Sequence, residues 1–138
     1  MQTTLGLRTS HIRALAWIAS RAASRSGANV TRQDVLRHLI RTAPINLPAD
    51  SIAAERVVIK RLPGTRGSIQ PVKVFALALS PDEAEVLDRL GRLFPTRAHR
   101  TNRSAAACAL VHAVVQRTPA LRAELAADGF DESMAYRR

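Results

Sequence analysis

Two short segments of the chain alternate apolar and polar side chains, and each precedes a longer helical pattern. These segments are residues 3–9 and residues 72–79. A period of two is typical of a strand that buries one face, so the sequence predicts two strands with one apolar face each. The side chains expected to face a core are Leu5, Leu7, Phe75, Leu77 and Leu79.

Two amphipathic helices are predicted after the first strand. Residues 11–24 carry apolar side chains at helical spacing, with Ser10 placed as the N-cap and Gly27 as the terminating residue. A second helix opens within Val30–Asp34, and Pro44 stops it.

The same order of elements returns after the second strand. Pro81 follows Ser80 directly, and Glu83 stands three residues after Ser80. This spacing is a strong signal for a capped helix start. Pro95 ends that helix, and the polar triplet 102–104 opens another, in the slot that residues 31–33 occupy in the first copy. The sequence therefore contains an internal repeat of strand, helix and helix.

The repeat predicts how the chain is organised. We expect a first repeat at residues 1–43, a linker with a short helix at 44–71, a second repeat at 72–117, and a short helix with a tail at 118–138. One repeat cannot fold alone, because its single strand has no hydrogen-bonding partner. The two repeats should form one mainly α domain with a two-stranded antiparallel ribbon, whose strands pair within one chain or between two.

Charge points to an anionic partner. The 138 residues contain 21 Lys and Arg against 11 Asp and Glu, which gives a net charge of +10. Residues 1–43 alone hold seven arginines against one acidic residue, Asp34. A surplus of this size destabilises a free fold by self-repulsion, so it favours a polyanion as the partner.

Other classes of function find little support in the composition. A single cysteine, Cys108, excludes an intrachain disulfide framework, and no apolar run is long enough to cross a bilayer. The four histidines are not spaced as metal ligands, and neither a catalytic triad pattern nor a phosphate-cradling glycine loop is visible. We expect no enzymatic activity, metal, cofactor or membrane association.

This order of strand, capped helix, turn and polar triplet resembles the ribbon-helix-helix superfamily of bacterial and phage DNA-binding proteins. Two units in one chain look like the TraY-type accessory proteins of conjugative relaxosomes and the tandem accessory protein of T-DNA border processing. The resemblance implies two ribbon-helix-helix repeats fused as a monomeric pseudo-dimer. It also implies double-stranded DNA as the partner and a cytoplasmic location on a bacterial nucleoid or plasmid.

By this resemblance, outward side chains of the ribbon read bases in the major groove. Arg8 is the strongest candidate, because arginine bonded to guanine is the commonest specific contact. The apolar side chains of the second strand either contact thymine methyl groups or do not read bases. In the second case the second repeat contributes chiefly phosphate contacts and structural support. The candidate readers are Gln2, Thr4, Gly6, Arg8, Val74, Ala76 and Ala78.

The resemblance also implies that the start of each second helix binds backbone phosphate, where free N–H groups and the helix dipole favour an anion. Because the two copies differ, an asymmetric DNA site is expected instead of a palindrome. The candidate phosphate contacts are Thr31, Arg32, Lys73, Arg97, Arg100, Asn102, Arg103 and Ser104.

The fused repeats favour an accessory role in conjugative plasmid or T-DNA transfer, with a relaxase or another transfer-complex protein as a further partner. A transcriptional repressor or an antitoxin is the alternative within DNA binding. A rival from another class is a protein-interaction module that acts through exposed helices and an acidic C-terminal segment. That segment contains Glu124, Asp128, Asp131 and Glu132.

Overall fold

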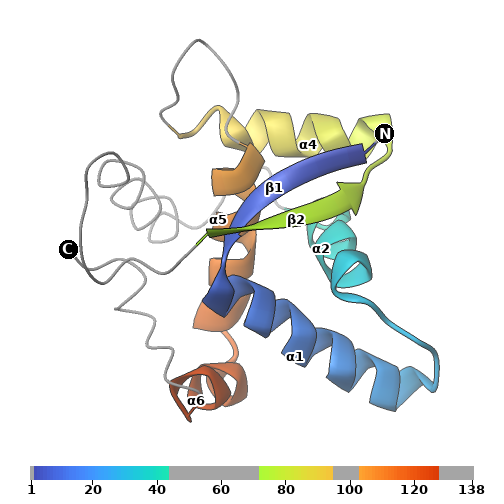
Figure 1. Cartoon of the computed structure of the whole chain (residues 1–138), viewed down its shortest axis with the longest axis vertical. Coiled ribbons are helices and arrows are strands. Elements are labelled where there is room, and N and C mark those ends of the chain that lie inside the picture. Colours follow the sequence, from blue (N-terminus) through green and yellow to red (C-terminus); the bar gives the residue numbers. More distant parts are fainter. Residues whose placement is uncertain (1, 44–71, 95–102, 128–138) are drawn as a thin grey trace.

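The computed structural model describes residues 2–43, 72–94 and 103–127, and these form a mainly helical fold with one two-stranded antiparallel sheet (Figure 1). The class expected from the sequence is thereby confirmed. The predicted linker helix, the loop before residue 103 and the C-terminal tail lie outside the described residues. The elements are β1 (Gln2–Arg8), α1 (Thr9–Ser26), α2 (Arg32–Arg41), β2 (Val72–Ala78), α4 (Pro81–Gly91), α5 (Arg103–Gln116) and α6 (Pro119–Ala127).

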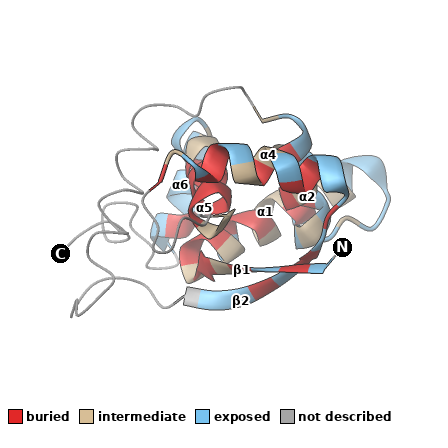
Figure 2. Ribbon diagram, turned by 90° about the horizontal axis from the view of Figure 1, so that it is seen from above, coloured by how far each residue is buried: buried red, intermediate tan, exposed pale blue. Residues whose placement is uncertain are grey.

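The two strands pair with each other within the chain, in a register that sets Leu5 opposite Phe75. The ribbon lies on one side of the helices, as the view from above shows (Figure 2). The five predicted inward side chains are all buried against the helices, so the period-two interpretation is confirmed. The opposite face of the ribbon is left uncovered by the described helices.

Helix α1 begins earlier than the sequence indicates. It starts at Thr9, directly after β1, with Arg8 as an N-cap residue that makes no side-chain capping bond. The expectation that Ser10 caps this helix is wrong: Ser10 is buried inside its first turn, because the chain passes from strand to helix without a turn between them. At the other end Gly27 has φ 72°, the left-handed conformation that glycine adopts at low cost, as predicted.

Helices α2 and α4 both begin with a capping box. Ser80 and Glu83 exchange the two bonds predicted for α4, with the Ser80 amide donating to the Glu83 carboxylate at 2.8 Å. Thr31 and Asp34 make the same exchange at the start of α2. Each box satisfies two backbone N–H groups that would otherwise lack partners at a helix start, and so fixes where the helix begins.

Helix α5 forms the centre of the fold. Every residue from Ala105 to His112 is buried, and the helix contacts β1 and the four other described helices. A helix that is apolar on all sides belongs in an interior, and its small alanines let the neighbours approach closely. The short helix α6 appears at the predicted bounds and buries Leu121 and Leu125 against α1 and α5. Among the described helices, none is long and apolar enough to cross a membrane.

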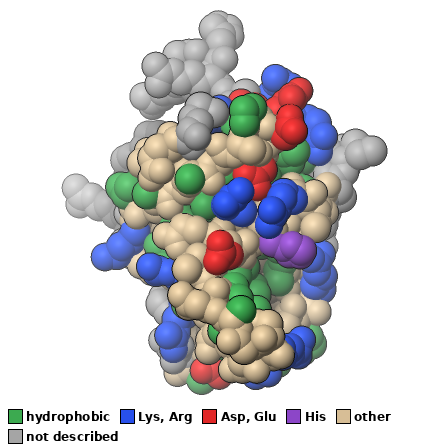
Figure 3. Space-filling model, turned by 90° about the vertical axis from the view of Figure 1, so that its right-hand side faces the viewer, with side chains coloured by type: hydrophobic (Ala, Val, Ile, Leu, Met, Phe, Trp, Pro, Cys, Tyr) green, Lys and Arg blue, Asp and Glu red, His purple; other side chains and the backbone are tan. Residues whose placement is uncertain are grey.

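A buried carboxylate joins α2 to α4. Glu83 accepts hydrogen bonds from Arg37 at 3.2 and 3.3 Å, and Arg41 lies 3.7 Å away. Burial would raise the pKa of Glu83, but hydrogen bonds from Ser80 and Arg37 outweigh that effect and lower it. One side of the molecule accordingly displays basic and acidic side chains close together (Figure 3). These two arginines of α2 therefore serve the fold.

Candidate nucleic-acid interface

The outer face of the ribbon carries the side chains expected there. Gln2 and Thr4 are exposed on β1, and Ala76 and Ala78 are exposed on β2. Val74 is 81% exposed, and it is the one large hydrophobic side chain that the described residues leave exposed. The register places Gly6, which is half-buried, opposite Val74. Two polar side chains and three apolar ones therefore share this surface.

Arg8 does not belong to that surface. The expected outward position is wrong, because Arg8 is only 3% exposed. The alternation of β1 ends one residue early, since Arg8 is also the N-cap of α1 and the chain there leaves the pleat of the ribbon. Burial lowers the pKa of His11, and the charge of Arg8 lowers it further. In this structure Arg8 cannot reach a base in a groove.

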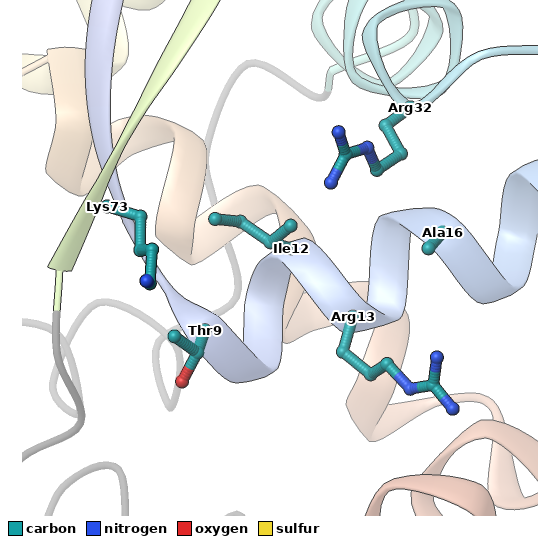
Figure 4. Close-up of a pocket in the computed structure, with 6 residues that line it drawn as sticks. All are labelled: Thr9, Ile12, Arg13, Ala16, Arg32 and Lys73. Atoms are coloured by element: carbon teal, nitrogen blue, oxygen red, sulfur yellow. The ribbon is translucent and has the colours of Figure 1, made fainter.

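A basic cavity of about 310 Å³ lies beside one end of the ribbon. Lys73 reaches from β2 toward Thr9, and Arg32 extends from the start of α2 on the opposite side (Figure 4). The other lining residues come from α1: Ile12, Arg13 and Ala16. Two cations, Lys73 and Arg32, and the Thr9 hydroxyl therefore border a small apolar floor, while the guanidinium of Arg13 points away from them (Figure 4). Cations and a hydroxyl are suitable chemistry for a phosphate group.

The start of α2 reinforces this cavity. Arg32 is the first residue of the helix, and its guanidinium lies 5.9 Å from the centre of the Phe75 ring on β2. Within the described part of the chain, neither Arg32 nor Lys73 forms an ion pair. The positive end of the helix dipole adds to their attraction for an anion. Hydrogen bonds from the amide and hydroxyl of Thr31 lower the pKa of Asp34, so one carboxylate also stands at this helix start.

Thr31 is exposed at the predicted position, but its side chain has a structural task. Its hydroxyl oxygen accepts a hydrogen bond from the Asp34 amide at 3.1 Å and completes the capping box. Lys73 is exposed near the strand end although its parity faces the core, as the sequence indicated.

The start of α5 is chemically different. Arg103 forms a bidentate ion pair with Asp88 of α4, with nitrogen to oxygen distances of 2.6 and 2.9 Å, and also lies 3.4 Å from the Thr3 hydroxyl. Hydrogen bonding to Asp88 raises the pKa of Arg103. The expectation of an available phosphate contact does not hold in this arrangement, because the Nε–Nη2 edge of the guanidinium, which suits a phosphate, is already bonded to a carboxylate.

Ser104 also serves the ribbon itself. Its hydroxyl oxygen accepts a hydrogen bond from the Gly6 amide at 2.9 Å, and the Cys108 thiol lies 3.8 Å from the Gly6 carbonyl oxygen. Helix α5 thus satisfies the outer edge of β1 at one residue. This tie fixes where the ribbon sits on the helices. Cys108 is buried, as expected for a small apolar side chain.

The sequence did not single out Thr9 and Arg13. They stand four residues apart, on one face of a helix, and that spacing was a usable signal. The start of α1 was placed two residues late, so Thr9 was assigned to the strand and not to the helix. The remaining predicted phosphate contacts, Arg97, Arg100 and Asn102, lie outside the described residues.

Comparison with protein-family models, with curated proteins and with solved structures found no match. In the described ranges, no group of three or more His, Cys, Asp or Glu side chains could hold a metal ion. The outer face of the ribbon and the basic cavity are therefore the features that indicate a function.

Proposed function

We propose that this chain binds double-stranded DNA by placing the outer face of the β1–β2 ribbon in the major groove, with the basic cavity against a backbone phosphate. The observation that carries the proposal is the position of Arg32 and Lys73 around one cavity at the end of an uncovered ribbon. A two-stranded ribbon fits the width of the major groove of B-DNA, where each base pair presents a distinct edge.

The contacts across the ribbon support a tandem pseudo-dimer of ribbon-helix-helix repeats. Each half contributes one strand, and the second helix of each half begins beside the strand of the other half. Arg32 at the start of α2 lies over Phe75 of β2, while Ser104 at the start of α5 bonds to Gly6 of β1. Such reciprocal contacts are those of a two-fold dimer made within one chain.

An accessory role in conjugative plasmid or T-DNA transfer is our choice among DNA-binding functions. The two halves differ both on the ribbon and at the helix starts, so the preferred site should be asymmetric. A two-fold repressor dimer favours a palindrome instead. A directional process requires a site that distinguishes its two sides, and a relaxase or another transfer protein would then bind next to this chain.

The rival interaction module gains less support. Helix α6 uses Leu121 and Leu125 for contacts inside the fold, so its apolar side is not offered to a partner. The outer ribbon face, with exposed Val74 beside cations, is the surface that an anionic partner would contact.

Binding to a fluorescein-labelled 30-base-pair duplex of random sequence, measured by anisotropy across a sodium chloride series, tests the proposal. The double variant R32Q/K73Q should lose the contact to the phosphate in the cavity. The slope of log affinity against log salt should become shallower by about 0.9, and the affinity at 0.15 M salt should fall roughly fivefold.

A matched control removes the same charge elsewhere. Arg89 and Arg92 are exposed at the end of α4, which lies on the opposite side of the molecule from the ribbon (Figure 2). The variant R89Q/R92Q should change the slope by much less. An equal loss in both variants would contradict a defined phosphate site, and absence of duplex binding at low salt would contradict DNA binding altogether.

A further inference from the structure

The outer face of the ribbon has an unusual composition for a surface that would read bases. On β2 its side chains are Val74, Ala76 and Ala78, and all are exposed. Val74 stands out, because it is the one large hydrophobic side chain that is exposed in the described residues. Apolar surface left in water is unfavourable, and a binding partner would remove that cost.

The strand register arranges these side chains in rows. The outward pairs are Gln2 with Ala78, Thr4 with Ala76, and Gly6 with Val74. Alternate residues of a strand are about 7 Å apart, which matches two steps of about 3.4 Å between base pairs. The three rows therefore cover about four base-pair steps. Hydrogen-bonding side chains occur in the first two rows, and the third has none.

The third row is also the one nearest the cations. Lys73 precedes Val74 on β2 and lines the basic cavity together with Arg32. A phosphate held in that cavity would bring the adjacent base pairs over Val74 first. Since Arg8 is buried, no charged side chain stands in the rows to bond to a guanine edge.

We propose that this face recognises the C5-methyl groups of pyrimidines in the major groove, which are those of thymine in ordinary DNA. The inference rests on the proposed DNA binding and specifies what the ribbon reads. A methyl group against Val74 and the two alanines buries apolar surface on both sides. An unmethylated cytosine has only a hydrogen at C5, so less apolar surface would be buried against Val74 and the two alanines.

Four alternating duplexes test this with matched backbones: poly(dA-dT), poly(dA-dU), poly(dG-dC) and poly(dG-5-methyl-dC). Within each pair the members differ by the C5-methyl group. Measured with the full chain at one salt concentration, the affinity should be about fourfold higher for each methyl group that is buried. Equal affinities within both pairs would overturn methyl recognition while leaving DNA binding intact. Failure to bind any of the four would instead contradict the proposed function itself.

Two variants separate the methyl contact from the phosphate contact. V74S removes exposed apolar atoms, so it should leave thermal unfolding unchanged and reduce the preference for the methylated member of each pair. K73Q should weaken binding to all four duplexes by a similar factor and keep the methyl preference. An undiminished preference in V74S would overturn the inference, because the valine would then not be the contact.

Discussion

The second helices of the two halves begin at matching places beside the ribbon, yet their first cations are used differently. At the start of α2, Arg32 lines a basic cavity together with Lys73. At the start of α5, Arg103 is bound to Asp88. The neighbouring element decides the difference, because α4 supplies a carboxylate to Arg103, whereas the residues of α1 that line the basic cavity include no carboxylate. A shared local pattern therefore fixes where a cation sits, but not whether it is available to a phosphate.

The two junctions between strand and first helix also differ. In the second half, Ser80 and Glu83 cap α4 with a full set of hydrogen bonds. In the first half, the strand enters α1 without a capping side chain, and Arg8 and His11 are buried at the junction. The first half thus buries Arg8 and His11 at its junction and has a basic cavity at the surface. The second half has a conventional helix cap, and its Arg103 is paired with a carboxylate.

The largest effect is expected from removing Arg8. Because the side chain is buried, R8A should lower the free energy of unfolding by about 2 kcal/mol, measured by urea denaturation. R8M keeps much of the apolar stem and should lose less. Base preference should not change in R8M. A variant of normal stability that loses a preference for guanine would show that Arg8 reaches the groove after all.

Arg8 illustrates what the sequence can and cannot predict. The strands, their inward faces and the Ser80 cap follow from period and spacing over a few residues, and the structure has them. The burial of Arg8 depends on the residue at which the strand alternation ends, and a shift of one residue changes the face on which Arg8 lies.

The ion pair of Arg103 with Asp88 could not be predicted from the sequence, for a different reason. Its partner Asp88 is on another helix, 15 residues earlier, and only the packing of α4 on α5 brings them together. The basic cavity likewise needs α1, α2 and β2 in place. Nonlocal contacts of this kind leave no period in the sequence.

The next effect concerns acid stability at the first junction. Burial lowers the pKa of His11 well below its usual 6.5, and the charges of Arg8 and His112 lower it further. The unfolded chain therefore takes up a proton near pH 6.5 that the folded chain refuses. The free energy of unfolding is highest above that pH and should fall by about 1.4 kcal/mol for each pH unit below about 6, until the folded pKa is reached.

Urea denaturation between pH 5 and pH 7.5 measures this slope. H11L should reduce it, because the titrating group is then absent from both states. H38Q, at an exposed position of α2, is the matched control and should keep it. The same slope in H11L as in the unchanged chain would mean that other groups produce it.

The smallest effect is a gain of binding, and it tests the comparison of the two helix starts most directly. D88N removes the carboxylate that holds Arg103 and frees a guanidinium beside β1. One added phosphate contact should raise affinity for duplex DNA about fivefold at 0.15 M salt and steepen the salt dependence by about 0.9. E85Q makes the same change of charge at an exposed position of α4 and should raise affinity less. Equal gains would mean that general charge, not the release of Arg103, distinguishes the two ends of the ribbon.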